Sequence, residues 1–393
     1  MLFRSLTYHT PITILLMNIL LCPNAFKGSL TALEIAEAAA VGFKKSSIHF
    51  NCQVAPIADG GDGTMEVLVS HFDGVVKKLN VHDPLGRVIE ADYGLIEYGK
   101  TAVVEFASAS GIKHLTEEEL NPMIATSYGT GQLIQDAVKK GASHVIITLG
   151  GSATVDGATG ILSAIGFDFL DHYGNVLDAT QESILGKIHK VVDRREKEFR
   201  RVRYTVLCDV ENTLLGDKGA AAVFGPQKGA SPRMVRQLED QLSSLAQLMS
   251  VFTGINVNEV VGGGAAGGAA AFLCALLDAE MEKGSAYLLT KTGFYEKLAS
   301  ADLVLTAEGR IDEQTKYGKG PYEVARLAKE RSIPVVALSG QVDASLETHS
   351  FDYFDAILPI TSGPMTLEKA LELSGDNIER TCTQIGNILL LNR

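Results

Sequence analysis

SHVIITLGGSATVDGATGILSAIG, residues 143–166, is the stretch of sequence that decides the fold. It contains a short apolar run that is rich in β-branched residues and typical of a strand buried on both faces, formed by Val145, Ile146, Ile147 and Leu149. A Gly-Gly pair ends that strand, and Asp156 precedes a helix that we expect to end at Gly166. A strand, a glycine loop and a helix N-terminus in this order can bind phosphate or carboxylate through bare N–H groups. A loop of this kind is equally typical of an ordinary strand-to-helix turn.

The alternation of strands and helices is clear at both ends of the chain and changes in the middle. Residues 17–75 contain two strand-then-helix units, and the same alternation returns over residues 288–393. Residues 76–287 begin with alternating strands that are typical of a mixed sheet. We therefore expect an α/β protein with two domains. A flavodoxin/Rossmann-like parallel-sheet domain is formed by 17–75 and 288–393, and an inserted α/β domain with a mixed sheet is formed by 76–287.

Three local expectations concern segments whose pattern is less regular. The dense charge of residues 187–203 indicates a solvated face or excursion. Residues 303–306 are predicted to be a strand, with residues 308–312 as the loop that follows it. Apolar spacing over residues 366–390 predicts one long helix.

The N-terminal residues resemble a weak signal peptide. The apolar run ends without a small-residue cleavage site and is too short to span a bilayer. We expect the fold to begin at Met17, and residues 1–16 to be an upstream extension or a misassigned start. The alternative, a cleaved leader on a two-lobed solute-binding protein, stays open on the residues alone.

Composition and charge exclude several classes of partner. The chain has 393 residues and a formal net charge of -12, which disfavours binding to nucleic acid. No stretch is long and apolar enough for a membrane span, so no membrane partner is expected. The five cysteines show no CxxC spacing, which indicates reduced thiols and a cytoplasmic protein. The sequence does not fix the oligomeric state, and a homodimer is left open.

Carboxylates follow several predicted strands, where the ligands of open α/β sheets bind. Basic residues and glycine loops accompany them. Acids that bind Mg²⁺, cations that bind phosphate and glycines that allow close backbone approach together favour phosphoryl transfer. Each acid alone could simply cap a helix, so the prediction depends on their joint occurrence. The acids are Asp59, Asp62, Asp156, Asp209, Glu308 and Asp312, and the cations are Lys27, Lys228, Lys319 and Arg310.

Familiar nucleotide and hydrolase fingerprints are missing. The chain has no GxxxxGK[ST] motif and no kinase HRD or DFG motif. It has no GxGxxG at the first helix, which argues against the second alternative, an NAD-dependent hydroxy-acid dehydrogenase. The nine histidines show no metal-ligand spacing.

An ordered set of short motifs resembles the type 1 glycerate kinases. It covers residues 17 to about 390, and although each motif alone is weak, the ordered set is very specific. The motifs are PNAFKGS (23–29), ADGGDGT (58–64), GGSATVDG (150–157), CDVEN (208–212), FGPQKG (224–229), GAAGG (264–268), EGRID (308–312) and GK (318–319). The resemblance implies transfer of the ATP γ-phosphate to D-glycerate with Mg²⁺. The implied product is 2-phosphoglycerate, with 3-phosphoglycerate as the less favoured outcome.

The resemblance also implies the site residues, which we expect in an interdomain cleft. Lys27 and Arg310 would neutralise carboxylate or transferring phosphate, and Asp209 and Asp312 would bind Mg²⁺ or receive the hydroxyl proton, with Asp59 and Asp156 as alternatives. The glycine loops would hold phosphates or the glycerate carboxylate. The full set of expected binding residues is Asn24, Ser29, Asp59, Gly60, Gly61, Asp62, Thr64, Gly150, Gly151, Ser152, Asp156, Asn212, Gln227, Lys228, Gly267, Gly268, Glu308 and Lys319.

Two positions depart from the family pattern. Asn24 stands where the family commonly has Asp, and Asp62 where it commonly has Glu. Asn24 keeps the hydrogen-bonding shape without the charge, so we expect it to orient a ligand and not to act as an obligatory base. The carboxylate of Asp62 reaches about one C–C bond less far than that of Glu.

Overall fold

The computed structural model describes residues 16–47, 49–58, 60–312, 320–343 and 353–391. Internal contacts divide the chain into two units. Unit 1 consists of Met1–Pro56, Tyr295–Tyr317 and Pro321–Arg393, and unit 2 of Ile57–Phe294 and Gly318–Gly320. The main boundaries between the units therefore lie after Pro56 and Phe294, whereas the boundaries expected from the sequence lay after residues 75 and 287.

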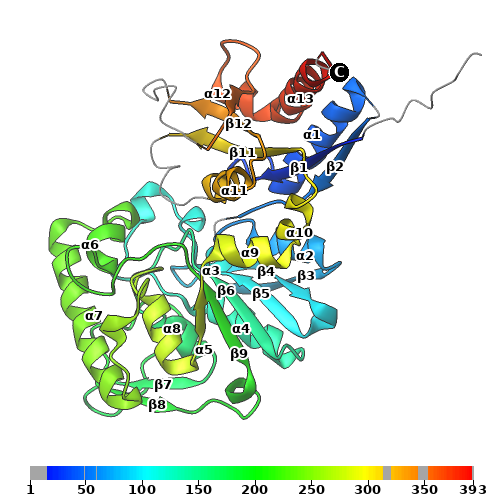
Figure 1. Ribbon diagram of the computed structural model, residues 1–393. Coiled ribbons are helices and arrows are strands. Elements are labelled where there is room, and N and C mark those ends of the chain that lie inside the picture. The colour runs from blue at the N-terminus through cyan, green and yellow to red at the C-terminus, as the bar shows by residue number, and fades with distance from the viewer. Residues whose placement is uncertain (1–15, 48, 59, 313–319, 344–352, 392–393) are drawn as a thin grey trace, which may run out of the picture. The chain divides into compact units, whose positions relative to one another are not determined.

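Unit 1 is built on a parallel sheet made from both ends of the chain (Figure 1). Its strands are β1 (Met17–Pro23), β2 (Phe50–Val54), β11 (Leu303–Ile311), β12 (Val335–Val342) and β13 (Ala356–Pro359). Their spatial order is β13-β12-β11-β1-β2, and every pair is parallel. Counted along the chain within the unit, this is the 2-1-3-4-5 order of flavodoxin-like sheets. The expected parallel sheet is confirmed, and its topological switch point lies between β1 and β11.

The helices of unit 1 begin with α1, whose first turn carries the capping box expected of a Thr-x-x-Glu sequence. Glu34 N–H donates to Thr31 Oγ1 over 3.2 Å, and Thr31 N–H donates to Glu34 Oε2 over 2.8 Å. α1 and α13 lie side by side (Figure 1), and a Cβ at Gly42 would come within 2.3 Å of the Glu379 carbonyl oxygen. The helices are α1 (Ala32–Ser46), α10 (Phe294–Leu298, which begins in unit 2), α11 (Gly320–Lys329), α12 (Leu367–Glu372) and α13 (Ser374–Leu390).

Unit 2 contains a mixed sheet, as expected for the inserted domain. The strands are β3 (Val75–His82), β4 (Val88–Ile96), β5 (Thr101–Glu105), β6 (His144–Thr148), β9 (Arg203–Leu207) and β10 (Glu280–Glu282), in the order β10-β9-β6-β5-β4-β3. The first four in that order are parallel to one another. β4 is antiparallel to its neighbour β5, and β3 is antiparallel to β4. All residues of β6 are buried, as its apolar sequence predicted.

The helices of unit 2 cover this sheet and bury a large apolar core. The helix that follows β6 and its glycine loop is α5, and Gly166 after it has φ 107, the left-handed conformation expected at that position. The helices are α2 (Thr64–His71), α3 (Phe106–Ser110), α4 (Tyr128–Lys139), α5 (Thr159–Ala164), α6 (Ala220–Phe224), α7 (Pro232–Thr253), α8 (Ala269–Leu277) and α9 (Gly284–Lys291). None of the described helices is long and apolar enough to cross a membrane.

Two local expectations were wrong, those for residues 308–312 and 366–390, and the charged segment 187–203 contains a strand that the sequence analysis did not identify. Residues 187–203 contain β8 (Lys190–Asp193), which forms a hairpin with β7 (Phe167–Leu170) and buries Val191 beneath its charges. The segment 308–311 continues β11, because Glu308 and Arg310 pair with Ser339 and Gln341 of β12. The predicted long C-terminal helix is two helices, α12 and α13, which are separated at Leu373.

Candidate functional site

The carboxyl ends of the parallel strands of unit 2 collect polar groups and glycines. Glu105 is the last residue of β5, Gly150 follows β6, Asp209 follows β9 and Gly284 follows β10. These strands are neighbours in the sheet and run in the same direction, so their carboxyl ends share one edge. Ligands of open α/β sheets bind at this edge.

The loop that contains Gly60 and Gly61 lies against these strand ends. A Cβ at Gly61 would be 3.2 Å from Gly150 Cα. A Cβ at Gly60 would be 3.0 Å from Gly284 Cα and 3.5 Å from the nearer carboxylate oxygen of Asp209. The backbones touch because glycine has no side chain, so segments far apart in the sequence meet around the Asp209 carboxylate.

Asp209 is held by the first turn of α9. The Ser285 N–H lies 3.4 and 3.3 Å from the two Asp209 carboxylate oxygens, and Ser285 Oγ lies 3.3 Å from Oδ1. Both donors belong to the N-terminal end of a helix, which favours a negative charge. Sequence reasoning missed Ser285. The Gly-Ser pair that follows the short run 280–282 was the available signal.

Glu105 is a second acid at this edge of the sheet, and sequence reasoning did not identify it. Its carboxylate accepts a 2.9 Å hydrogen bond from Met65 N–H in the first turn of α2. Burial raises the pKa of Glu105 to about 7, with a smaller contribution from the negative charge of Asp62, while the hydrogen bond from Met65 N–H opposes the shift. A carboxyl group with a pKa near neutrality can carry or accept a proton at physiological pH. Its signal in the sequence was an acid at the end of an apolar strand.

Asp62 lies beside the glycine loop after β6. A Cβ at Gly151 would be 3.4 Å from one Asp62 carboxylate oxygen and 3.6 Å from the other. Thr64 opens α2 and is fully buried, and within the described part of the chain its hydroxyl has no hydrogen-bond partner.

Lys228 braces the same glycine loop from within the core. Its ammonium donates to Ser152 Oγ over 2.9 Å and to the Thr154 carbonyl over 2.6 Å. Burial lowers the pKa of Lys228 to about 7, and the charge of Asp156 opposes this shift. Only 2% of the Lys228 surface is exposed, so these hydrogen bonds fix the loop from its buried side.

Asp156 is also buried, and its carboxylate accepts several hydrogen bonds. Its Oδ2 accepts from Ser127 N–H (2.9 Å), Ser127 Oγ–H (2.7 Å) and Gly160 N–H (3.3 Å), and its Oδ1 accepts from Ala158 N–H (3.3 Å). Asp156 therefore ties the loop to the start of α5, where Ala158 is the residue that precedes the helix. This is a cap-like function of the kind expected for an acid at a strand-to-helix turn.

The glycine run 262–268 packs against this loop. Gly157 N–H donates to the Gly267 carbonyl over 3.1 Å, and a Cβ at Gly267 would be 2.2 Å from the Thr154 carbonyl oxygen. The adjacent Gly268 has φ 89 and precedes α8. The run thus reinforces the loop through its backbone.

The two remaining predicted residues of unit 2 lie in flanking turns. Asn212 Nδ2 donates to the Lys218 carbonyl over 2.9 Å, and the Asn212 carbonyl accepts from Gly264 N–H over 2.9 Å. Gln227 is exposed in a short 3₁₀ turn.

Unit 1 places a second set of predicted residues at its switch point. Asn24 follows β1, and its N–H donates over 2.8 Å to the Ala307 carbonyl of β11. A Cβ at Gly309 would be 3.6 Å from Phe26 Cα and 3.9 Å from Lys27 N. The loop that carries Lys27 therefore lies on β11 beside Glu308, and the Lys27 side chain is exposed.

Arg310 lies between two acids of unit 1. Its guanidinium is 3.3 Å from the Asp312 carboxylate and 3.1 Å from the Asp343 carboxylate. Ser29 Oγ donates to the Leu371 carbonyl over 2.8 Å, which holds the Lys27 loop against the end of α12. The predicted residues Asp59 and Lys319 lie outside the described residues.

The donor set is compatible with Mg²⁺ only if phosphate and water complete the coordination. Among the described residues, no group of three or more His, Cys, Asp or Glu side chains could hold a metal. Mg²⁺ is commonly bound by one or two carboxylates together with substrate phosphates, so a carboxylate such as that of Asp209 fits such a site.

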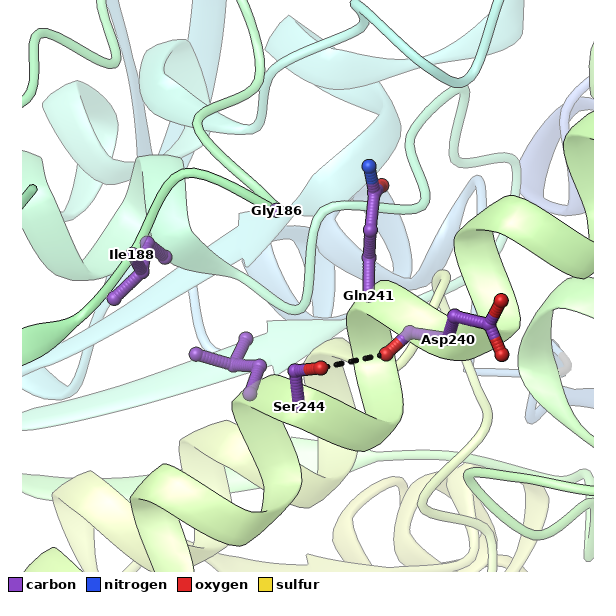
Figure 2. Close-up of a pocket in the computed structure, with 6 residues that line it drawn as sticks. Gly186, Ile188, Asp240, Gln241 and Ser244 are labelled. Carbon is purple, nitrogen blue, oxygen red and sulfur yellow. Dashed lines mark hydrogen bonds between the residues drawn. The ribbon is translucent and has the colours of Figure 1, made fainter. Parts of the chain in front are cut away.

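Three cavities described in unit 2 have linings that include none of the predicted residues. One of about 150 Å³ lies between α7 and the segment 186–188. Figure 2 shows its lining, in which Ser244 Oγ–H donates to the Asp240 carbonyl over 2.9 Å. None of the residues that line it belongs to the predicted site.

Comparison with known proteins gives one consistent result. A family model described as "Glycerate kinase family" matches residues 19–390. A glycerate kinase of Bacillus cereus is 38% identical over 376 residues, which is 95% of this chain and 98% of that protein. A glycerate 2-kinase of Escherichia coli is 36% identical over 375 residues, with the same coverage. A solved structure assigned as a glycerate kinase 2 of Salmonella typhimurium is 37% identical, with a TM-score of 0.84 over 96% of this chain and 99% of that chain.

Proposed function

The chain belongs to the glycerate kinase family and is a kinase, and on that premise we propose that it transfers the γ-phosphoryl group of ATP to D-glycerate. The proposed products are ADP and 2-phosphoglycerate. The family decides against a solute-binding protein and against an NAD-dependent dehydrogenase. The five cysteines are free thiols, which supports the proposal of a cytoplasmic enzyme.

The observation that carries the proposal is the convergence around Asp209. Its carboxylate is oriented by Ser285, and two backbone segments rich in glycine approach it closely. Phosphoryl transfer depends on positioning and charge stabilisation more than on covalent chemistry. We assign the backbone N–H groups of Gly60, Gly61 and Gly150 to the phosphates.

Asp209 and Asp312 are the carboxylates that we propose for Mg²⁺ or for the proton of the glycerate hydroxyl. Bound Mg²⁺ would supply positive charge to the phosphate oxygens. Lys27 and Arg310 would neutralise the glycerate carboxylate or the transferring phosphoryl group. Glu105 is an additional proton acceptor, because its pKa is raised to about 7.

Lys228 and Asp156 have positioning roles in this proposal. Both are buried, and both fix the glycine loop through hydrogen bonds. Their proposed contribution is to keep the N–H groups of the loop directed at the phosphates, which electrostatic catalysis requires.

The test is ADP release with D-glycerate and ATP, followed by ³¹P and ¹H NMR of the product. We expect 2-phosphoglycerate. Replacing Asp209 with Asn should lower kcat at least about 10²-fold, a loss typical of a charged group that acts in the transition state. The matched control is Glu211→Gln, because Glu211 is exposed and pairs with Lys283 at the surface over 3.2 Å. ADP release without a phosphorylated glycerate would refute the proposal, and 3-phosphoglycerate as product would refute its regiochemistry.

A further inference from the structure

A polar cavity of about 260 Å³ lies between α9 and one face of the mixed sheet in unit 2. None of the predicted site residues lines it. It contains two permanent or near-permanent cations and one acid, in a chain whose formal net charge is -12. The residues that line it are His144, Arg203, Thr205, Glu282, Tyr287, Thr290 and Lys291.

The strand register places the sheet side of the cavity. His144 pairs with Arg203 in adjacent strands, so both side chains point to the same face. Thr205 lies two residues further along β9 and points to that face as well. His144 and Arg203 are the first residues of β6 and β9, whereas Asp209 follows the last residue of β9. On β6 and β9 the cavity therefore lies towards the amino ends and the candidate site beyond the carboxyl ends, while Glu282 extends the lining to the last residue of β10.

The hydrogen bonds of His144 fix its tautomer. Arg203 Nη2 can only donate, and it lies 3.0 Å from His144 Nδ1, so Nδ1 is the acceptor. His144 Nε2–H therefore donates to Thr205 Oγ1 over 2.9 Å. Among the described residues no acceptor is recorded for the Thr205 hydroxyl proton, so this group can donate into the cavity. Burial lowers the pKa of His144 to about 4, which keeps the imidazole neutral at physiological pH.

The remaining lining groups favour an anion. The Arg203 guanidinium is 3.8 Å from the Glu280 carboxylate, and both side chains are more than half exposed, so this pair is weak and holds Arg203 only loosely. Lys291 Nζ lies 5.4 Å from the centre of the Tyr287 ring. Burial raises the pKa of Tyr287 to about 12, so its phenol stays protonated and can donate. Glu282 is the one acid that lines the cavity.

We propose that this cavity is a second binding site, which takes a small anion bearing a phosphate group. Arg203 and Lys291 supply the charge, and Thr205 and Tyr287 supply neutral donors. The volume is just below the lower end of the range typical of small-molecule pockets, which suits a phosphate on a short carbon skeleton. The proposal depends on the cavity and not on the reaction assigned to the chain.

The experiment is an NMR titration of the full chain, labelled with ¹⁵N in its histidine side chains, with inorganic phosphate. The control titration uses chloride at equal ionic strength, and the His144 signals are assigned by their loss in His144→Gln. We expect saturable shifts of the His144 signals with phosphate only. The variants Arg203→Gln and Lys291→Gln should each weaken the apparent Kd about tenfold, because a charge-assisted hydrogen bond contributes on that order. The exposed Lys139→Gln should bind phosphate as the wild type does.

Two further variants keep the test decisive. Glu282→Gln removes the opposing charge and should tighten phosphate binding, an effect that unfolding cannot imitate. Asp209→Asn should leave the phosphate-dependent His144 shifts unchanged, which distinguishes this cavity from the candidate site. The proposal is overturned if phosphate leaves the His144 signals in place. It is also overturned if the Arg203, Lys291 and Glu282 variants all bind phosphate with the wild-type affinity.

Discussion

The Lys228 ammonium donates a 2.6 Å hydrogen bond to the carbonyl oxygen of Thr154 from a fully buried position. The same ammonium reaches Ser152 Oγ, so one side chain spans the glycine loop that follows β6. A buried cation is costly to desolvate unless its hydrogen bonds are satisfied, so the geometry of the loop and the charge of Lys228 depend on each other.

Replacing Lys228 with Met keeps the volume and removes both hydrogen bonds. The Thr154 carbonyl and the Ser152 hydroxyl then lose a buried partner, which costs about 1–3 kcal/mol for each group left unsatisfied. Removal of the desolvated charge offsets part of this loss. We expect kcat to fall because the loop is no longer fixed. Expressed as an activation free energy, this loss should be larger than the change in the free energy of unfolding. Urea unfolding and steady-state ADP release measure the two effects, with exposed Lys139→Met as the control. A variant with normal kcat would show that Lys228 does not position the loop.

Glu105 predicts a pH dependence of stability whose sign follows from its raised pKa. Between about pH 4.5 and 7 the folded protein retains a proton that the unfolded chain has lost. The contribution of Glu105 to stability is therefore fully present below about pH 4.5 and is lost as pH rises towards 7. Glu105→Gln removes this loss and keeps an acceptor for Met65 N–H.

We expect the urea midpoint of Glu105→Gln to exceed that of the wild type above pH 7, with the difference shrinking towards pH 4.5. Exposed Glu117→Gln is the matched control for a general effect of removing a carboxylate. A pH-independent difference for Glu105→Gln would mean that Glu105 titrates normally in the folded protein.

The contact between Gly150 and Gly61 predicts a severe effect of a single methyl group. A Cβ at Gly150 would lie 2.7 Å from Gly61 Cα. Because the contacted atom belongs to the backbone, this clash can be relieved only by moving one of the two loops. We expect Gly150→Ala to lose about 1–3 kcal/mol of unfolding free energy, the usual cost of overpacking. The apparent affinity for ATP should also fall. Gly363→Ala, which adds a methyl group in open space, should change neither quantity. Wild-type stability and ATP affinity in Gly150→Ala would rule out the close approach of these two loops.

The sequence predicts what local patterns determine. The apolar run of residues 145–149 predicts β6, and the Thr31–Glu34 capping box marks the start of α1. The sequence is less informative where pairing between strands far apart in the chain decides the structure. Arg310 resembles a loop residue, yet β12 extends β11 through it.

The candidate site shows the same limit. An acid directly after a strand is visible in the sequence, as for Asp209. The orientation of Asp209 depends on Ser285, which is 76 residues away. The buried role of Lys228 likewise depends on Ser152 at a separation of 76 residues, and nothing near Lys228 in the sequence distinguishes it from an exposed lysine.

Lys27 and Asp312 of unit 1 give the last prediction. If both act in the transition state, Lys27→Ala and Asp312→Asn should each lower kcat at least about 10²-fold. Lys27 is exposed, so its loss should leave the urea midpoint unchanged. Lys44→Ala, an exposed lysine on α1, serves as the control for a general effect of charge.

A double variant tests whether residues of the two units act in one chemical step. Groups that act as a unit show strongly non-additive effects, so Lys27→Ala combined with Asp209→Asn should lose far less than the product of the two single losses. The measurement is kcat for the wild type, the two single variants and the double variant at saturating ATP and D-glycerate. Losses that multiply would assign Lys27 and Asp209 to independent functions.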